Sequence, residues 1–266
     1  MTEQRESGSE QESPERKERA ILVHYHLFKN AGTSVDRALK GIYGSRWTSI
    51  EADSGDEELP LERMQRLIDR SPDVAAISSH TARIEPWALR NVMVFPIVFV
   101  RHPIDRIMSA YEFERKQSAD TLGASKAKEL PFREYVEFFV SLNARTFRNF
   151  HSYRISRASR RKELPEVERA LDAVDTLPFV GVVEEFETSI RCLERRTRLL
   201  FPELKLANMH ANAGSRSSSL ESRLADIRNQ LGPDLYAATC DKNLRDLVIW
   251  ERARLALARA ERKLHV

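Results

Sequence analysis

The chain has 266 residues, of which 41% are hydrophobic and 31% charged, so it can bury a core and is not expected to be disordered throughout. Its formal net charge of only +3 gives no reason to expect nucleic acid binding. Two cysteines, Cys192 and Cys240, exclude a disulfide framework or a zinc pattern and fit a reducing compartment.

Two absences bear on location. No apolar run is long enough to span a bilayer, and the N-terminus lacks the apolar core of a signal peptide. We therefore expect a cytoplasmic protein without a transmembrane segment. Residues 1–18 contain almost nothing apolar and are expected to be a disordered tail, and residues 19–266 a single α/β domain.

The first predicted strand leads into a tight polar turn. Ile21–Val23 is a short apolar run, and a helix is expected over Thr33–Lys40. Between them stand Lys29, Asn30, Ala31 and Gly32, whose small or turn-tolerant types let backbone approach a ligand. A helix N-terminus has unpaired N–H groups and a partial positive charge. With Lys29 and the hydroxyls of Thr33 and Ser34, this turn is predicted to bind a phosphate.

Strands and helices then alternate. A short apolar run at 74–78 leads to His80, and the most strand-like segment spans 92–100. Later elements are helices at 132–140, 166–174, 188–201, 220–231 and 244–263, a strand at 179–183 and a polar loop at 208–219. Such alternation predicts a three-layer α/β fold with a central parallel sheet flanked by helices.

A second junction repeats the first. Arg101-His102-Pro103 ends the strand at 92–100, and a helix follows from Ile104. Ligands of open parallel sheets bind beyond the carboxyl ends of the strands, so two basic junctions at one edge would define one site. The Lys29 turn is not a Walker A loop, because no Gly-Lys pair occurs in the chain.

Three stretches resemble the sulfotransferase family, particularly its carbohydrate-modifying, glycan O-sulfotransferase-like branch. His26-Leu-Phe-Lys29-Asn-Ala-Gly-Thr-Ser34 resembles the 5′-phosphosulfate loop. Arg101 and Ser109, eight residues apart and followed by an aromatic pair, resemble the 3′-phosphate element. Residues 179–186 resemble a later strand of the same branch. The resemblance implies a P-loop-like fold and 3′-phosphoadenosine 5′-phosphosulfate (PAPS) as donor, without a metal.

Carried over residue by residue, the resemblance gives most of the predicted donor site. Lys29 would contact the 5′-phosphate and the bridging oxygen, and Gly32 would let the backbone approach the ligand closely. Thr33 and Ser34 would hold phosphate oxygens, and Arg101 and Ser109 the 3′-phosphate. A second basic contact from a late loop is assigned to Ser215 and Arg216.

His80 is the first choice for the base that accepts the proton of the acceptor hydroxyl. It follows a short strand and would lie at the same sheet edge, although glycine and aromatic neighbours of the family pattern are missing. Among the other histidines, His26 is expected to orient the loop and His102 the 3′-phosphate turn. A carboxylate base stays open, with Glu51, Asp53 and Glu112 as alternatives.

Residues 145–162 hold seven basic and no acidic side chains. Near-helical spacing of four of them predicts one basic helix face: Arg154, Arg157, Arg160 and Arg161. Such a face would fit an acidic acceptor, but it could equally pair with the acidic segments at 51–58 and 163–168. The acceptor is expected to be a carbohydrate, and a lipid, small alcohol or natural-product intermediate stays open, as does the oligomeric state.

Two other functions remain open from the sequence. A nucleotide or small-molecule kinase would use the same α/β frame, but it needs a phosphate loop ending in Gly-Lys, which the chain lacks. A non-catalytic anion-binding module would use the arginine stretch and leave the two phosphate elements without a role.

Overall fold

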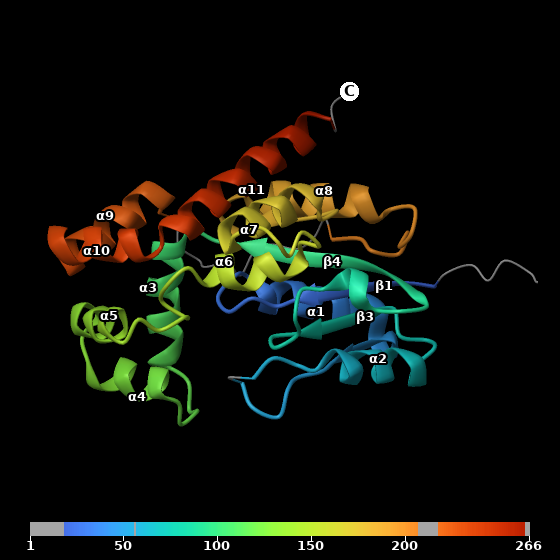
Figure 1. Ribbon diagram of the computed structural model, residues 1–266, viewed down its shortest axis with the longest axis horizontal. Helices are drawn as coiled ribbons and strands as arrows, with labels where there is room; N and C mark the ends of the chain where they lie inside the picture. The colour runs from blue at the N-terminus through green and yellow to red at the C-terminus, as the bar shows by residue number, and fades with distance from the viewer. Residues whose placement is uncertain (1–18, 56, 207–217, 264–266) are drawn as a thin grey trace, which may run out of the picture.

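The computed structural model describes residues 19–55, 57–206 and 218–263 (Figure 1). The predicted tail at 1–18 lies outside these residues. At the centre is a parallel sheet of five strands in the order β2-β3-β1-β4-β5, and helices flank it. The strands are β1 (Arg19–Tyr25), β2 (Trp47–Ser49), β3 (Ala76–Ser79), β4 (Val92–Val100) and β5 (Gly181–Val182). The predicted α/β class with a central parallel sheet is confirmed.

The register aligns the carboxyl ends of the inner strands. Tyr25 at the end of β1 pairs with Ser79 at the end of β3, and with Val98 near the end of β4. The last six residues of β4 are buried, as expected for a parallel strand covered on both faces. Because all neighbouring strands are parallel, the chain leaves the sheet at one edge after each of them.

Eleven α-helices lie within the described residues. Those of the first half are α1 (Gly32–Tyr43), α2 (Leu61–Arg70), α3 (Pro103–Glu114), α4 (Leu122–Glu129) and α5 (Phe132–Ser141). Those of the second half are α6 (Phe150–Ile155), α7 (Glu166–Thr176), α8 (Phe186–Thr197), α9 (Leu220–Leu231), α10 (Pro233–Lys242) and α11 (Leu244–Arg262). None is long and apolar enough to cross a membrane.

The buried apolar residues form two clusters. The larger one holds the sheet and the helices packed on it, including Ile21, Phe99 and Ile249. The smaller one is built around α3 and joins α4, α5, α9 and α10 at one end of the molecule (Figure 1). Since α3 starts shortly after β4, the smaller cluster begins close to the carboxyl edge of the sheet.

Local differences from the predicted elements have clear causes. Helix α1 starts at Gly32 with Ala31 as its N-cap residue, and it runs through Gly41 to end before Gly44, whose φ is 55°. The expected basic helix face is wrong, because α6 ends at Ile155 and a 3-10 turn follows. Helix α10 follows α9 directly after Gly232 and was not expected, since Pro233 suits the first turn of a helix as well as a loop.

Candidate functional site

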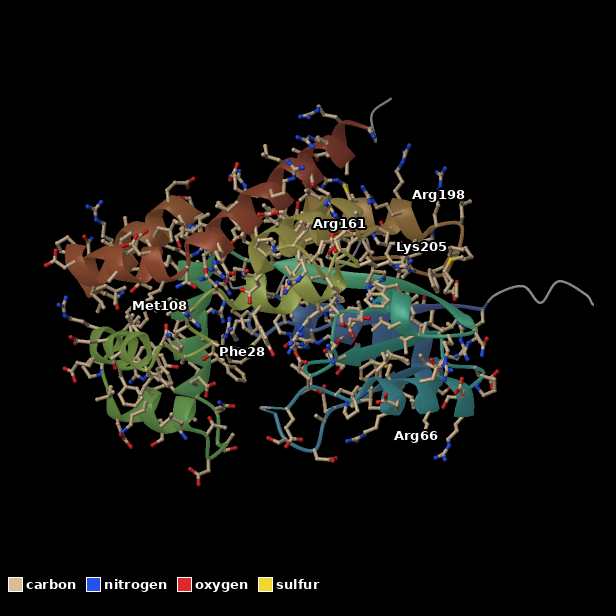
Figure 2. The ribbon with its side chains drawn as sticks, viewed as in Figure 1. Phe28, Arg66, Met108, Arg161, Arg198 and Lys205 are labelled. Carbon is tan, nitrogen blue, oxygen red and sulfur yellow. The ribbon has the colours of Figure 1, made fainter. Side chains whose placement is uncertain are left out.

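A cavity of about 1270 Å³ opens at the carboxyl edge of the sheet. The residue that follows each of four strands lines it: His26 after β1, His80 after β3, Arg101 after β4 and Val183 after β5. The starts of α1, α8 and α9 and one side of α3 contribute further walls. Figure 2 places Phe28, a lining residue, between the sheet and the helices around α3.

The turn after β1 has an unusual backbone. Lys29 and Ala31 both adopt positive φ, 63° and 61°, although neither is a glycine. Such a conformation is unfavourable for side chains with a Cβ and persists only where the surroundings hold it. No side chain within the described residues caps the N-terminus of α1. The first residues of this helix, Gly32, Thr33 and Ser34, line the cavity, and the N–H group of Ser34 donates to the carbonyl oxygen of Ala31 at 3.1 Å. The N-terminus of α1 therefore meets the cavity without a competing side-chain acceptor.

Asn30 anchors this turn to the interior of the protein. Its side chain is buried, and its amide nitrogen lies 3.1 Å from Nε2 of His151 on α6. The other ring nitrogen of His151 lies 3.2 Å from the carboxylate of Asp246 on α11. Asp246 also accepts backbone N–H groups of His151 and Ser152, both at 2.8 Å. The turn is thus anchored to two helices that are distant in sequence.

The turn after β4 is held by charge. Arg101 donates from Nη1 to the carbonyl oxygen of Lys29 at 3.2 Å, so the two turns touch. Its guanidinium also pairs with Asp105, at 2.7 Å, and Arg223 on α9 reaches the same carboxylate at 2.9 Å. Burial raises the pKa of Asp105, but the guanidiniums of Arg223 and Arg101 outweigh it and hold that pKa below its usual range.

Another wall of the cavity carries Ser109, Glu112 and Phe113 of α3, and Lys116 just after this helix. The Nζ of Lys29 lies 4.3 Å from the centre of the Phe113 ring, and the Phe28 and Phe113 rings meet edge to face at 5.7 Å. An ammonium over an aromatic face is a favourable contact. Lys29 therefore lies between the helix N-terminus and an aromatic pair at the cavity mouth.

His80 faces the cavity with its side chain 54% exposed. The Glu51 carboxylate accepts from Nδ1 of His80 at 2.9 Å and from the backbone N–H groups of His80 and Thr81, both at 3.0 Å. Arg154 donates to the carbonyl oxygens of His80 and Ala82. The hydrogen bond between Nδ1 and the Glu51 carboxylate raises the pKa of His80. With Nδ1 engaged, Nε2 is the ring nitrogen left to exchange a proton.

Glu51 is held ionised by the same contacts. Burial raises its pKa, but the hydrogen bonds from His80 and Thr81 outweigh that effect and lower it to about 2. A carboxylate that stays charged beside a histidine fixes the tautomer and orientation of the ring. Glu51 itself does not line the cavity, so His80 is the member of the pair that borders it.

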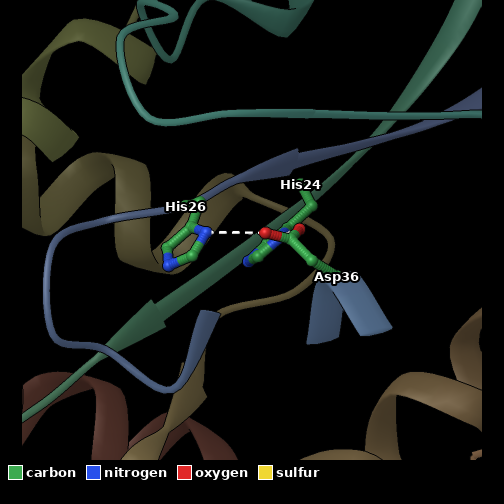
Figure 3. A group of neighbouring side chains, drawn as sticks. All are labelled: His24, His26 and Asp36. Carbon is green, nitrogen blue, oxygen red and sulfur yellow. Dashed lines mark hydrogen bonds and ion pairs between the residues drawn. The ribbon is translucent and has the colours of Figure 1, made fainter. Parts of the chain in front are cut away.

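Three side chains meet beneath the first turn (Figure 3). Nδ1 of His24 lies 2.6 Å from one oxygen of Asp36, and Nδ1 of His26 lies 2.7 Å from the other. Their ligand atoms lie within 4.8 Å of one another, so they are the group in the described part of the chain that could hold a metal ion. At these distances each imidazole N–H hydrogen-bonds the carboxylate directly. The expected absence of a metal stays a prediction.

His102 lies behind the second turn. Its backbone N–H donates to Glu184 at 2.8 Å, and its ring packs edge-on against Trp250, with 4.8 Å between the ring centres. Burial lowers the pKa of His102 to about 4, so the ring is neutral at physiological pH. Burial also raises the pKa of Glu184, which lines the cavity. A neutral ring fits the predicted orienting role of His102.

A sequence model of the Sulfotransferase family matches residues 16–249, which is most of the chain. The chain belongs to the sulfotransferase family. It is also 39% identical over 243 residues to an uncharacterized protein of Archaeoglobus fulgidus, covering 88% of this chain and 96% of the archaeal one. Membership in this family supports sulfuryl transfer as the reaction. It favours a sulfotransferase over the two other functions left open, a kinase and a non-catalytic anion-binding module.

The cavity of this sulfotransferase brings together most of the predicted site. Lining it are Lys29, Ala31, Gly32, Thr33, Ser34, His80, Arg101 and Ser109. Asn30 does not line it, because its side chain turns inward to His151. Of the alternative bases, Glu112 lines the cavity, whereas Glu51 contacts His80 and Asp53 pairs with Arg63. Ser215 and Arg216 lie outside the described residues.

Arg223 is a basic lining residue that sequence reasoning missed. A basic contact was expected from the late loop, and Arg223 stands in the first turn of α9 just after that loop. A basic residue close to a predicted helix start after a polar loop was the available signal. Asp105 forms ion pairs with both Arg223 and Arg101. Nothing in the sequence pointed to this role, because an acidic residue in the first turn of a helix is common.

The basic stretch of the sulfotransferase forms ion pairs within the protein. Arg157 lies 3.6 Å from Glu58, Arg145 lies 3.5 Å from Glu166, and Arg161 lies 3.5 Å from Glu163. Arg160 and Lys162 lie over the Trp87 ring. Pairing with the acidic segments was one of the two interpretations left open, and these contacts favour it over a free basic face.

Proposed function

We propose that this sulfotransferase moves a sulfuryl group from PAPS to a hydroxyl of a carbohydrate. One observation carries the donor assignment: Arg101 hydrogen-bonds the backbone of Lys29, so both cationic turns border one cavity. PAPS has phosphates at both ends of its ribose, which requires two anion sites within one nucleotide length. When bound, PAPS supplies the sulfuryl group and leaves as adenosine 3′,5′-bisphosphate.

The residues of the two turns fit the two phosphate ends. Lys29, the uncapped first turn of α1 and the hydroxyls of Thr33 and Ser34 would hold the 5′ end. Arg101 and Ser109 would hold the 3′-phosphate, and Arg223 joins them through Asp105. The cationic groups would stabilise negative charge that develops on the leaving phosphate.

His80 is the base in this proposal, and Glu51 orients it. Its free Nε2 would take the proton of the acceptor hydroxyl, and the ionised Glu51 would stabilise the resulting imidazolium. Because only neutral His80 accepts a proton, and its pKa is raised, turnover should increase with pH through a value above 6.5. Glu112 remains the carboxylate alternative that borders the same cavity.

A carbohydrate acceptor has the support of the cavity wall at α3. This wall combines the aromatic pair Phe28 and Phe113 with the charged side chains Glu112 and Lys116. Sugar rings present both apolar faces and hydroxyl groups, so such a mixture suits them. The volume of about 1270 Å³ exceeds the usual range of 300–1,000 Å³ for a site that takes one small ligand, which leaves room for an acceptor beside the donor. An acidic acceptor and a cytoplasmic location stay predictions.

Thermal unfolding tests the donor assignment. Adenosine 3′,5′-bisphosphate should raise the melting temperature, whereas ATP with magnesium should leave it unchanged, because only a ligand of the native state stabilises it. The reverse pattern would favour a kinase. The reaction is then tested with sulfur-labelled PAPS and a panel of oligosaccharides, for which label transfer is expected.

The His80→Ala variant tests the base. It should bind adenosine 3′,5′-bisphosphate like the wild type and lose turnover by about 10²–10⁴-fold. Lys128→Ala, on α4 and outside the cavity lining, is a control for surface substitution. Unchanged turnover in His80→Ala would remove His80 from the site and direct attention to Glu112.

A further inference from the structure

His26 touches the donor turn and His80 at once. Its ring stacks on the His80 ring with 3.9 Å between centres and 30° between planes. The edge of the same ring lies against Gly32, where an added Cβ would approach Cδ2 of His26 to 1.9 Å. Only a residue without a Cβ fits against this ring, so the ring and the start of α1 are in close contact.

Asp36 fixes the His26 ring in this place. The Asp36 carboxylate accepts from Nδ1 of His26 at 2.7 Å, and Figure 3 shows the ring directed at it from the end of β1. Burial raises the pKa of Asp36, but the hydrogen bonds from His24 and His26 lower it well below the usual range. Burial lowers the pKa of His26 itself. The pair is therefore a carboxylate and a neutral imidazole in a fixed tautomer.

Two imidazole–carboxylate pairs thus face each other. His80 is held by Glu51 from the segment after β2, and His26 is held by Asp36 from α1. The rings are in contact, but only His80 is highly exposed in the cavity, since His26 is 8% exposed. A displacement of the donor turn would move the His26 ring, and a displaced His26 ring would no longer support His80.

We propose that His26, oriented by Asp36, is a positioning residue that couples the donor turn to His80. In this arrangement the base is set correctly when the turn has its phosphate-binding conformation. The inference rests on the proposed function for the role of His80. It goes beyond that function in giving the second histidine a task that is neither donor binding nor proton transfer.

Two substitutions separate packing from orientation. His26→Phe keeps a flat ring against Gly32 and His80 but loses the hydrogen bond to Asp36, and Asp36→Asn alters the same bond from the other side. We expect both variants to lower kcat by about tenfold to a hundredfold while the Kd of adenosine 3′,5′-bisphosphate changes less than about threefold. A merely structural ring would leave kcat intact in His26→Phe and change only the melting temperature.

His24→Phe is the matched control. His24 shares the Asp36 carboxylate and lies next to His26, with 5.3 Å between ring centres, but it does not line the cavity. The same substitution there should leave kcat within about twofold of the wild type. An equal loss of kcat in His24→Phe and His26→Phe would overturn the proposal, because general damage to the Asp36 cluster would then explain both.

The pH profile gives a second readout. The groups that face His80 are Glu51, His26, Asp36 and Arg154. The Asp36 carboxylate favours protonated His80, so Asp36→Asn should shift the acid limb of the kcat profile to lower pH. An unshifted limb together with unchanged kcat would count against the coupling.

A double-mutant cycle tests the contact with the donor turn and needs no turnover. Gly32→Ala should weaken binding of adenosine 3′,5′-bisphosphate, and His26→Ala should remove most of that effect by vacating the space. Additive effects would overturn the coupling. Failure of the wild type to bind the bisphosphate would instead contradict the proposed function, so the two failures are distinguishable.

Metal content is a separate test. If the purified protein holds one metal ion per chain and His26→Phe loses it, the histidines and Asp36 form a metal site and the proposed coupling is overturned.

Discussion

The turns after β1 and β4 have the same place in the fold but are stabilised in different ways. The first has a strained backbone at Lys29 and Ala31 and is supported by a buried amide and imidazoles. The second has Pro103 in its first helical turn and is supported by the ion pairs of Asp105. Backbone conformation and buried hydrogen bonds therefore position Lys29, whereas ion pairs position Arg101. Substitutions that remove the support of the first turn should therefore act through its backbone geometry, and those that remove the support of the second should act through charge.

The largest expected effect is at Lys29. In Lys29→Ala the cation nearest the leaving phosphate is lost, and we expect turnover to fall by about 10²–10³-fold, as for the loss of one electrostatic contact to the transition state. Lys40→Ala on α1, the helix that follows this turn, is the control, because Lys40 lies over Trp47 and does not line the cavity. Labelled PAPS measures the transfer. Equal activity of both variants would remove Lys29 from the reaction.

Arg101→Lys tests whether charge alone is sufficient at the second turn. A lysine keeps the charge but cannot hold Asp105 and a phosphate with a planar fork, so we expect the Kd of adenosine 3′,5′-bisphosphate to rise about tenfold. Arg115→Lys, at the end of α3 and over the Tyr111 ring, should leave the Kd unchanged. Calorimetry at fixed salt measures both. Unchanged affinity in Arg101→Lys would mean that the fork geometry has no part in binding.

Asn30→Ala tests the support beneath the first turn. Removing the amide leaves Nε2 of buried His151 without its partner, and we expect the free energy of unfolding to fall by about 1–3 kcal/mol. Bisphosphate binding should also weaken, because the positive φ angles at Lys29 and Ala31 lose part of their support. Denaturant unfolding of Asn30→Ala and of the exposed control Asn229→Ala provides the comparison. Equal stability would show that the anchor is dispensable.

The smallest expected effect is a change in stability at acid pH. The depressed pKa of Asp105 means that its ion pairs stabilise the protein fully above about pH 3.9, its unfolded value, and lose that contribution as the pH falls further. Asp105→Asn should therefore be less stable than the wild type at pH 6, and the difference should shrink below pH 4. Thermal unfolding across this range measures it. A difference that stays constant with pH would exclude the ion pairs as its cause.

Much of the donor site follows from local sequence because its chemistry is local. A strand of apolar residues, a turn with a lysine and a helix start place Lys29, Gly32 and Thr33 at a strand end whatever lies elsewhere. Arg101 lies in the turn before α3 and Ser109 lies within that helix, so a short local segment brings both residues to the cavity. The side-chain contact of Asn30 could not be predicted in this way, because a turn asparagine looks available to a ligand until its distant partner His151 is known.

The sequence by itself determined the α/β class and the family, and it determined the order of the two basic junctions, since periodicity and short motifs depend on neighbours in the chain. Only the tertiary structure decided which carboxylate meets which cation. Glu51 reaches His80 across 29 residues, and Arg223 reaches Asp105 across 118. Such pairs form because parallel strands and packed helices bring remote segments to one edge, and no local pattern records that.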